Sequence, residues 1–176
     1  MNLIPPQRYP RELAAEARTP LLQVGWSDWV KAIVPKTAHQ PGFSTRRPNG
    51  WTREYQEILS NAPGLPYDMA NGCGIYEWQI RKIENWNETK IVVYIGSTCE
   101  AFPGTSLRDR VIEFCTNGSN KADLINNALT REYELWVRVK SASDREAAQD
   151  LENELLDCYD YAWNLRRNGE FRRILP

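Results

Sequence analysis

The C-terminal part of the chain contains three runs in which hydrophobic and polar residues follow the pattern of β-strands. Residues 74–80 and 90–96 are rich in β-branched and aromatic residues, and residues 133–139 alternate Tyr, Leu and Val with Glu, Trp and Arg. A period of two is typical of a strand with one buried face. The stretch Asn85-Trp86-Asn87-Glu88 between the first two runs predicts an antiparallel hairpin with a longer loop.

Apolar residues recur at helical spacing over residues 106–117 and 122–129. Ser106, with Asp109 in the following turn, predicts the start of the first of these helices. The helix is predicted to end near Gly118. Ser119 or Asn120 is predicted to cap the second helix.

The last predicted helix is the longest. Ser143 and Glu146 form a capping box at its start, and its apolar stripe runs to about Trp163. The resulting order β-β-α-α-β-α predicts an α+β domain over residues 71–176, with a small three-stranded antiparallel sheet and flanking helices.

Residues 1–70 have a different character. Prolines interrupt every regular pattern there, and only short helical patterns remain, over residues 11–18, 27–33 and 52–59. We therefore predict an irregular N-terminal segment that packs on the domain of residues 71–176.

Composition excludes several classes of protein. No run of about eighteen apolar residues is present, so a membrane span is excluded. The first residues lack the apolar region of a secretory signal, so an intracellular protein with four reduced thiols, mostly in the core, is expected. The irregular cysteine spacing and a single histidine disfavour structural zinc. A net charge of −1 argues against binding nucleic acid by charge alone, although arginines cluster locally.

Glu152 stands out on the last predicted helix. At about 100° per residue it lies inside the apolar stripe, between Ala148, Leu156 and Tyr159. A buried carboxylate needs a cation, a metal or a proton, because burying the bare charge costs several kcal/mol. A structural ion pair with an arginine and a functional site are both open alternatives.

Two tripeptides favour a functional site over a structural ion pair at Glu152. Gly74-Ile75-Tyr76 stands on the first predicted strand and Tyr94-Ile95-Gly96 on the second. Together with the element order, they make residues 72–174 resemble the GIY-YIG nuclease family. The family motif also has a Leu-x-x-Arg, a Glu and an Asn, which match Leu107 with Arg110, Glu152 and Asn164. Residues 157–164 more specifically resemble the plant effector of transcription proteins.

The resemblance implies a metal-dependent DNA endonuclease or nickase that hydrolyses phosphodiester bonds. Tyr76 would be the general base, with its pKa lowered from about 10 by a metal and an arginine, and Tyr94 would assist it. Arg110 would clamp the scissile phosphate, and Glu152 would hold Mg²⁺ or Mn²⁺. Asn164 would support the backbone near the helix end.

Several neighbouring residues leave alternatives open. Arg108 competes with Arg110, because helix geometry does not separate them. Lys82 and Lys90, at the hairpin ends of the strands, are candidates for lowering a tyrosine pKa or binding phosphate, or else face solvent. Phe114 stands where some family members have His or Tyr, which removes one proton carrier.

Further cations are candidates for contacts with the DNA backbone, which give affinity without sequence information. They are Lys121, Arg166, Arg167, Arg172 and Arg173. Three tryptophans are candidates either for stacking on bases or for packing, namely Trp78, Trp86 and Trp136.

An alternative function is a catalytically weak or inactive DNA-binding module that regulates transcription on the same fold. The resemblance to the plant effectors, the modest charge and the missing His favour it, and this resemblance implies a nuclear location. A restriction enzyme is a third possibility. In each case the expected partner is DNA.

Overall fold

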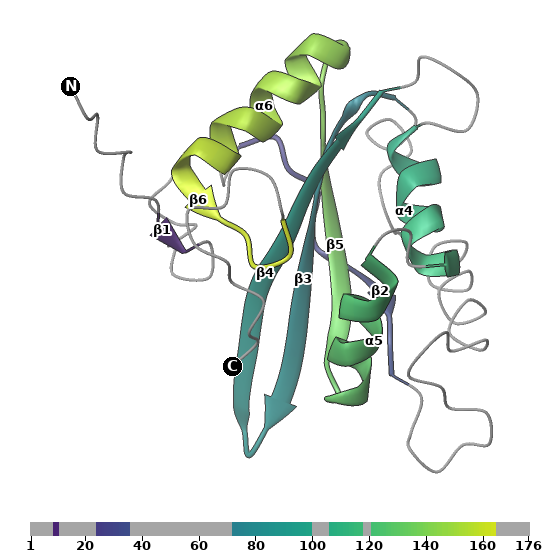
Figure 1. The fold of residues 1–176 in the computed structure, drawn as a ribbon, viewed down its shortest axis with the longest axis vertical. Coiled ribbons are helices and arrows are strands. Elements are labelled where there is room, and N and C mark those ends of the chain that lie inside the picture. The colour runs from purple at the N-terminus through teal and green to yellow at the C-terminus, as the bar shows by residue number, and fades with distance from the viewer. Residues whose placement is uncertain (1–8, 11–23, 36–71, 100–105, 118–120, 165–176) are drawn as a thin grey trace.

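The computed structural model describes residues 9–10, 24–35, 72–99, 106–117 and 121–164. Its main sheet has four antiparallel strands in the order β2-β5-β3-β4. These strands are β2 (Val30–Ile33), β3 (Gly74–Glu84), β4 (Asn87–Thr98) and β5 (Glu134–Ser141). The helices are α4 (Leu107–Asn117), α5 (Ala122–Thr130) and α6 (Arg145–Cys158), as Figure 1 shows. A second sheet pairs β1 (Tyr9–Pro10) with β6 (Tyr159–Asp160) in parallel.

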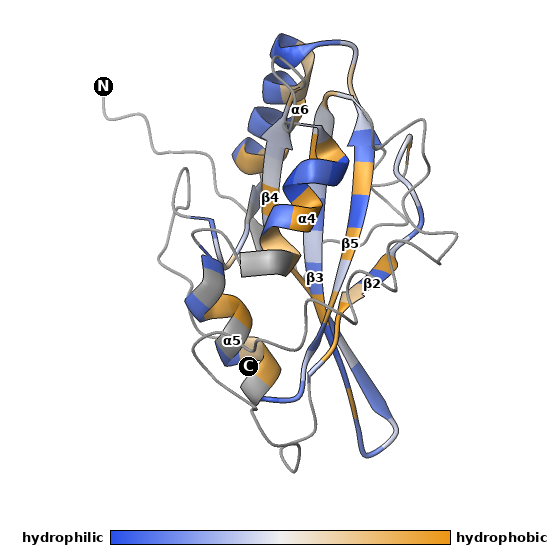
Figure 2. Ribbon diagram, turned by 90° about the vertical axis from the view of Figure 1, so that its right-hand side faces the viewer, coloured by the Kyte–Doolittle hydropathy of each residue, from blue (hydrophilic) through white to orange (hydrophobic). Residues whose placement is uncertain are grey.

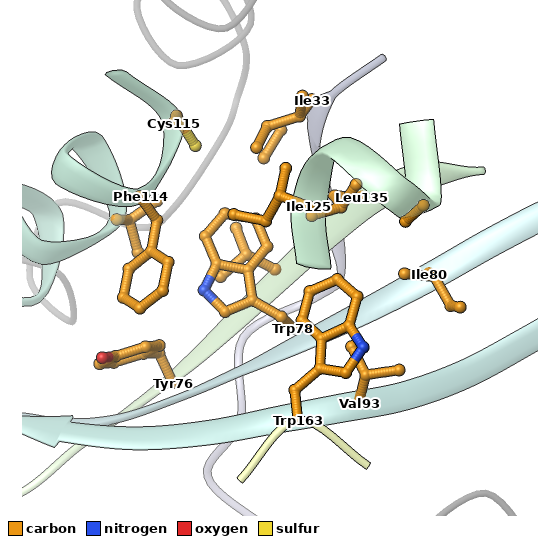
Figure 3. Close-up of a cluster of buried hydrophobic side chains, with 14 of the residues drawn as sticks. Ile33, Tyr76, Trp78, Ile80, Val93, Phe114, Cys115, Ile125, Leu135 and Trp163 are labelled. Carbon is orange, nitrogen blue, oxygen red and sulfur yellow. The ribbon is translucent and has the colours of Figure 1, made fainter. Parts of the chain in front are cut away.

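The main sheet separates two layers of core. Tyr76, Trp78 and Ile80 of β3 belong to the cluster that includes α4 and α5 (Figure 3). Ile75 of β3 points the other way and packs with Leu155 of α6. Figure 2 shows the same alternation of hydrophobic and hydrophilic residues along β5. The predicted α+β class and its element order are therefore confirmed for residues 72–164.

The prediction of a three-stranded sheet is wrong by one strand, because Val30–Ile33 forms β2 beside β5. The helical pattern over residues 27–33 was misleading here. Ser27 instead fixes the chain beside β5, since its amide donates to the Val139 carbonyl at 2.8 Å and its hydroxyl accepts from the Val139 amide at 3.0 Å. Pairing with a distant strand overrides a short local pattern. The helical patterns over residues 11–18 and 52–59 lie outside the described residues.

The turn between β3 and β4 is tighter than the predicted longer loop. The strands pair as far as Glu84 with Asn87, which leaves only Asn85 and Trp86 in the turn. Both residues have positive φ, 50° and 67°. Two consecutive positive φ angles match the twist of a hairpin, and Asn adopts this conformation readily.

The helix ends differ from the predicted ones in detail. Ser106 caps α4 with Asp109 as expected, but the cap of α6 is Asp144, whose carboxylate accepts from the Ala147 amide at 2.8 Å. The N-cap of α5 is Lys121 rather than Ser119 or Asn120, and it makes no side-chain capping bond. Helix α6 ends at Cys158 rather than near Trp163, because the next residues turn extended and pair with β1.

The expectation of four reduced thiols is wrong for one pair. Cys73 and Cys99 form a disulfide at the open end of the β3–β4 hairpin. The register causes this pairing, because Gly74 lies opposite Thr98 and the two cysteines are the next residues outward. Cys115 is buried and Cys158 is exposed, and neither takes part in a disulfide. Among the described residues no helix is long and apolar enough to cross a membrane.

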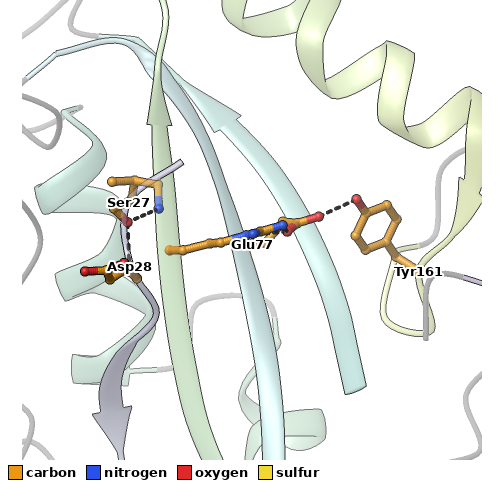
Figure 4. A network of polar contacts seen from close by, with 6 residues as sticks. Ser27, Asp28, Glu77 and Tyr161 are labelled. Carbon is orange, nitrogen blue, oxygen red and sulfur yellow. Dashed lines mark hydrogen bonds and ion pairs between the residues drawn. The ribbon is translucent and has the colours of Figure 1, made fainter. Parts of the chain in front are cut away.

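A buried polar network joins segments that are distant in the sequence. The Arg138 guanidinium of β5 donates to Glu77 Oε2 of β3 at 2.6 and 2.9 Å, and the Tyr161 hydroxyl donates to Glu77 Oε1 at 2.6 Å (Figure 4). The same guanidinium lies 4.3 Å from the ring centroid of Trp26 and 4.7 Å from that of Trp29. Residues 26–29 are therefore held against the sheet by charge as well as by backbone pairing.

We expect Arg138→Met to lower the free energy of unfolding by about 3 kcal/mol, because it leaves the Glu77 carboxylate buried without its cation. Chemical denaturation measures this change. Arg145→Met, at an exposed position of α6, is the matched control and should change the same quantity by less than about 0.5 kcal/mol. Equal losses in the two variants would contradict the importance of the buried pair.

Candidate active site

Tyr76 is the most deeply buried tyrosine of the site, with 2% of its surface exposed on β3. Its ring lies directly against Gly96 of the neighbouring strand, opposite it in the register. A Cβ atom at Gly96 would lie 2.5 Å from Tyr76 Cζ and closer still to the hydroxyl oxygen. Only glycine therefore leaves room for the tyrosine ring at this position.

Tyr94 and Phe114 complete an aromatic cluster around Tyr76. The ring centroids of Tyr76 and Tyr94 are 6.2 Å apart, and Phe114 of α4 lies 5.7 Å from the first and 5.6 Å from the second. Figure 3 shows Tyr76 and Phe114 next to each other, with their rings in an edge-to-face arrangement at 60°. Tyr94 is the more accessible of the two tyrosines. Phe114 thus holds both rings in place but offers no proton.

Of the two candidate arginines of α4, Arg110 interacts electrostatically with both Tyr76 and Tyr94. The Arg110 guanidinium donates to Glu113 Oε2 at 2.5 Å, and this hydrogen bond raises the pKa of Arg110. A permanent cation, partly exposed, therefore stands beside the tyrosine pair.

Glu152 approaches the tyrosines from the opposite side of the sheet. It is half-buried on α6, and its Oε2 accepts a hydrogen bond from the Ser97 hydroxyl of β4. Its negative charge contributes to raising the pKa of Tyr76, so the two groups are close enough to interact. The sequence reasoning considered an arginine as a partner of Glu152 and missed Ser97, although Ser97 directly follows the Tyr94-Ile95-Gly96 tripeptide.

The pKa of Tyr76 lies well above its usual value of about 10. Burial is the main cause, and the neighbouring Tyr94 charge adds to it, while Arg110 lowers the pKa to a smaller extent. An interaction between the Tyr76 and Tyr94 hydroxyl groups also raises the pKa of Tyr76. The lowering by arginine that the sequence suggested is thus present but is outweighed by burial.

Asn164 joins the end of the described chain to the second tripeptide. Its side-chain oxygen accepts from the Ile95 amide at 3.0 Å, and its amide nitrogen donates to the Ile95 carbonyl at 2.9 Å. This geometry is that of a backbone anchor for β4, in keeping with the supporting position suggested by the sequence.

Two of the candidate lysines lie elsewhere than expected. Lys82 is six residues from Tyr76, about 20 Å along the strand, and its ammonium is 3.7 Å from Glu84 and 4.0 Å from Glu132, so the structure does not bring it to the site. Lys121 is not a surface cation, because only 6% of its surface is exposed. Its Nζ lies 5.1 Å from the Tyr94 ring centroid.

The remaining candidates for nucleic-acid contacts divide into two groups. Arg166, Arg167, Arg172 and Arg173 lie outside the described residues. Of the three tryptophans, Trp78 is part of the core and Trp136 packs under Arg81, whose guanidinium carbon is 3.9 Å from the ring centroid. Trp86, at the hairpin turn, is 99% exposed.

The donor set around Glu152 fits a weakly held Mg²⁺ ion. No group of three or more His, Cys, Asp or Glu side chains that could enclose a metal occurs in the described part of the chain. A hard cation of this kind keeps several waters and often uses only one or two carboxylates together with substrate phosphates. Glu152 with Ser97 beside it meets that requirement, but only with a phosphate present.

Comparison with known proteins adds one finding. A family model described as GIY-YIG domain-containing protein matches residues 26–174. The match includes the strand β2 and all the candidate residues of the site. No curated protein matches the chain, and no solved structure does.

We expect Gly96→Ala to displace the Tyr76 ring and to lower the free energy of unfolding by about 1–3 kcal/mol, because the new methyl group overlaps the ring. Gly72→Ala is the matched control, since nothing lies within 4 Å of a Cβ at that position. Chemical denaturation of both variants tests this, and similar stabilities would contradict the close packing of Tyr76 on Gly96.

We also expect Tyr76 to make stability depend on alkaline pH. Because its folded pKa is raised, the unfolded chain loses this proton first, so the stability that the proton contributes is present below about pH 10 and is lost as the pH rises further. The free energy of unfolding of the wild type should therefore fall more steeply above about pH 10 than that of Tyr76→Phe. The two curves should run parallel near about pH 8, and parallel curves throughout would refute the assignment.

Proposed function

Because this chain belongs to the GIY-YIG domain family, we propose that it is a metal-dependent DNA endonuclease or nickase. Members of this family are in general nucleases that act on DNA. The observation that carries the proposal is that the Tyr76 ring packs on Gly96 while Glu152 is hydrogen-bonded to the next residue, Ser97. Arg110 of α4 acts electrostatically on the same tyrosine. A proton acceptor, a cation and a metal ligand can together promote phosphodiester hydrolysis.

Arg110 would bind the scissile phosphate. Its guanidinium is planar and permanently charged, and its partial exposure leaves it accessible to a substrate. The bond with Glu113 holds the side chain on the surface of α4 in the absence of DNA. On binding, the phosphate would compete with the Glu113 carboxylate for the same donors.

Glu152 would hold Mg²⁺ or Mn²⁺, and Ser97 would orient the carboxylate through its hydrogen bond. Such an ion, when bound, stabilises the negative charge that develops on the phosphate and the leaving oxygen. Since the carboxylate acts alone among the described acidic residues, we expect metal affinity to depend on the bound DNA.

Tyr76 and Tyr94 would form the proton-transfer pair. The Tyr76 and Tyr94 hydroxyl groups interact with each other, and Tyr94 is the more accessible of the two residues. Tyr76 alone is a poor general base at neutral pH, because burial raises its pKa and keeps the hydroxyl protonated. We therefore propose that Tyr76 and Tyr94 act together, with Arg110 favouring the ionised form.

The second candidate function is a DNA-binding regulatory module of low catalytic activity. The raised pKa of Tyr76 and the presence of Phe114 at the position of a potential proton carrier favour it. The resemblance of residues 157–164 to plant effector of transcription proteins would then suggest a role in the nucleus, with DNA as the partner in either case.

We expect the purified protein to nick supercoiled plasmid in the presence of Mg²⁺ or Mn²⁺. Glu152→Gln and Arg110→Ala should each lower the rate by about 100-fold or more, because each removes a group that stabilises charge in the transition state. Glu154→Gln, at an exposed position of the same helix, and Arg108→Ala should retain most of the rate. Gel electrophoresis of the plasmid forms is the measurement.

The outcomes separate the two functions. Equal nicking by all variants would indicate a contaminant and contradict the proposed site. Binding of DNA without nicking would favour the regulatory module. A loss in Arg108→Ala but not in Arg110→Ala would show that the other arginine binds the phosphate.

A further inference from the structure

Lys121 is buried where a lysine is not expected. It is the N-cap residue of α5 and only 6% of its surface is exposed. A lysine ammonium is strongly hydrated, and removing it from water is unfavourable unless its surroundings stabilise the charge. One such surrounding is the face of an aromatic ring, and Lys121 Nζ lies 5.1 Å from the ring centroid of Tyr94.

The Tyr94 ring connects Lys121 to the rest of the site. It packs against Phe114 and Tyr76, with ring centroids 5.6 and 6.2 Å away. Arg110 acts on the same two tyrosines electrostatically. The position of the Tyr94 ring therefore decides where the tyrosine pair presents its oxygens, and Lys121 is one of the groups that fix that ring.

We propose that Lys121 is a positioning residue of the active site that acts through the Tyr94 ring. The inference rests on the proposed nuclease function and differs from a contact with the DNA backbone. A backbone contact needs an ammonium that reaches solvent, whereas this one is covered. Lys121 should therefore affect kcat rather than KM. The ring that it holds belongs to the proton-transfer pair, whereas Arg110 binds the phosphate.

The test is a double-mutant cycle in the nicking assay. Lys121→Met keeps the length of the side chain and removes the charge, and it should lower kcat about 10-fold with little change in KM. Lys121→Arg should restore most of kcat, because a guanidinium also binds over an aromatic face. Lys31→Met is the matched control, because Lys31 of β2 also lies over an aromatic ring, that of Trp136, and pairs with Glu134, and it should leave kcat unchanged.

The second arm of the cycle uses Tyr94→Leu, which removes the ring. If Lys121 acts through the ring, adding Lys121→Met to this variant should change kcat less than about 2-fold. An undiminished 10-fold loss would overturn the proposal and indicate a direct contact with substrate. A rise in KM with a salt slope reduced by about 1 would likewise overturn it, because that is the behaviour of a phosphate contact.

A measurement without activity keeps this inference separate from the nuclease assignment. In protein labelled with ¹³C at tyrosine Cζ, the Tyr94 signal is assigned by its disappearance in Tyr94→Phe. It should shift in Lys121→Met and stay in place in Lys31→Met. If the wild type does not cut DNA, the proposed function fails, and an unchanged Tyr94 signal in Lys121→Met would independently overturn the role of Lys121.

Discussion

The close contact between Tyr76 and Gly96 is the constraint on which the site depends. Because Gly96 has no side chain, the Tyr76 ring packs directly on β4, which is an edge strand of the described sheet. Glu152 reaches the same edge from the opposite layer, where Ser97 holds it one residue further along β4. The two faces of a sheet are normally isolated from each other by the backbone and its side chains. Here one glycine at an edge strand lets a tyrosine and a carboxylate from different layers act on one another.

Hydrogen bonds and a disulfide fix β4 on both sides of this contact. Asn164 binds both backbone groups of Ile95, which directly precedes Gly96. On the other side, the disulfide between Cys73 and Cys99 closes the hairpin just beyond the two tripeptides. The site is thus built at the rigid end of a long hairpin, whereas the turn at Asn85 and Trp86 projects past the last pair between β3 and β5. An active site requires rigid supports of this kind, because its catalytic groups must be placed accurately.

The sequence predicted those parts of the structure that depend on local pattern. The strands β3, β4 and β5 and the helices followed from periodicity, and Glu152 was conspicuous because a carboxylate stood in an apolar stripe. Contacts between distant segments could not be derived in that way. Three features depend on which surfaces meet after folding. They are the pairing of Val30–Ile33 with β5, the hydrogen bond of Ser97 to Glu152 and the burial of Lys121. The charge of a lysine in a sequence suggests a surface position, and nothing local reveals that an aromatic ring will cover it.

The strand Val30–Ile33 has a practical consequence for any shortened version of this protein. A fragment that begins at Gly72 would contain both tripeptides and every residue of the site, yet it would lack the neighbour of β5. The backbone groups of β5 that now pair with β2 would then form an open edge beside the buried side chains of Leu135 and Val137. Open edges of this kind recruit further strands from other copies, so the fragment would be prone to aggregation for a reason unrelated to its chemistry.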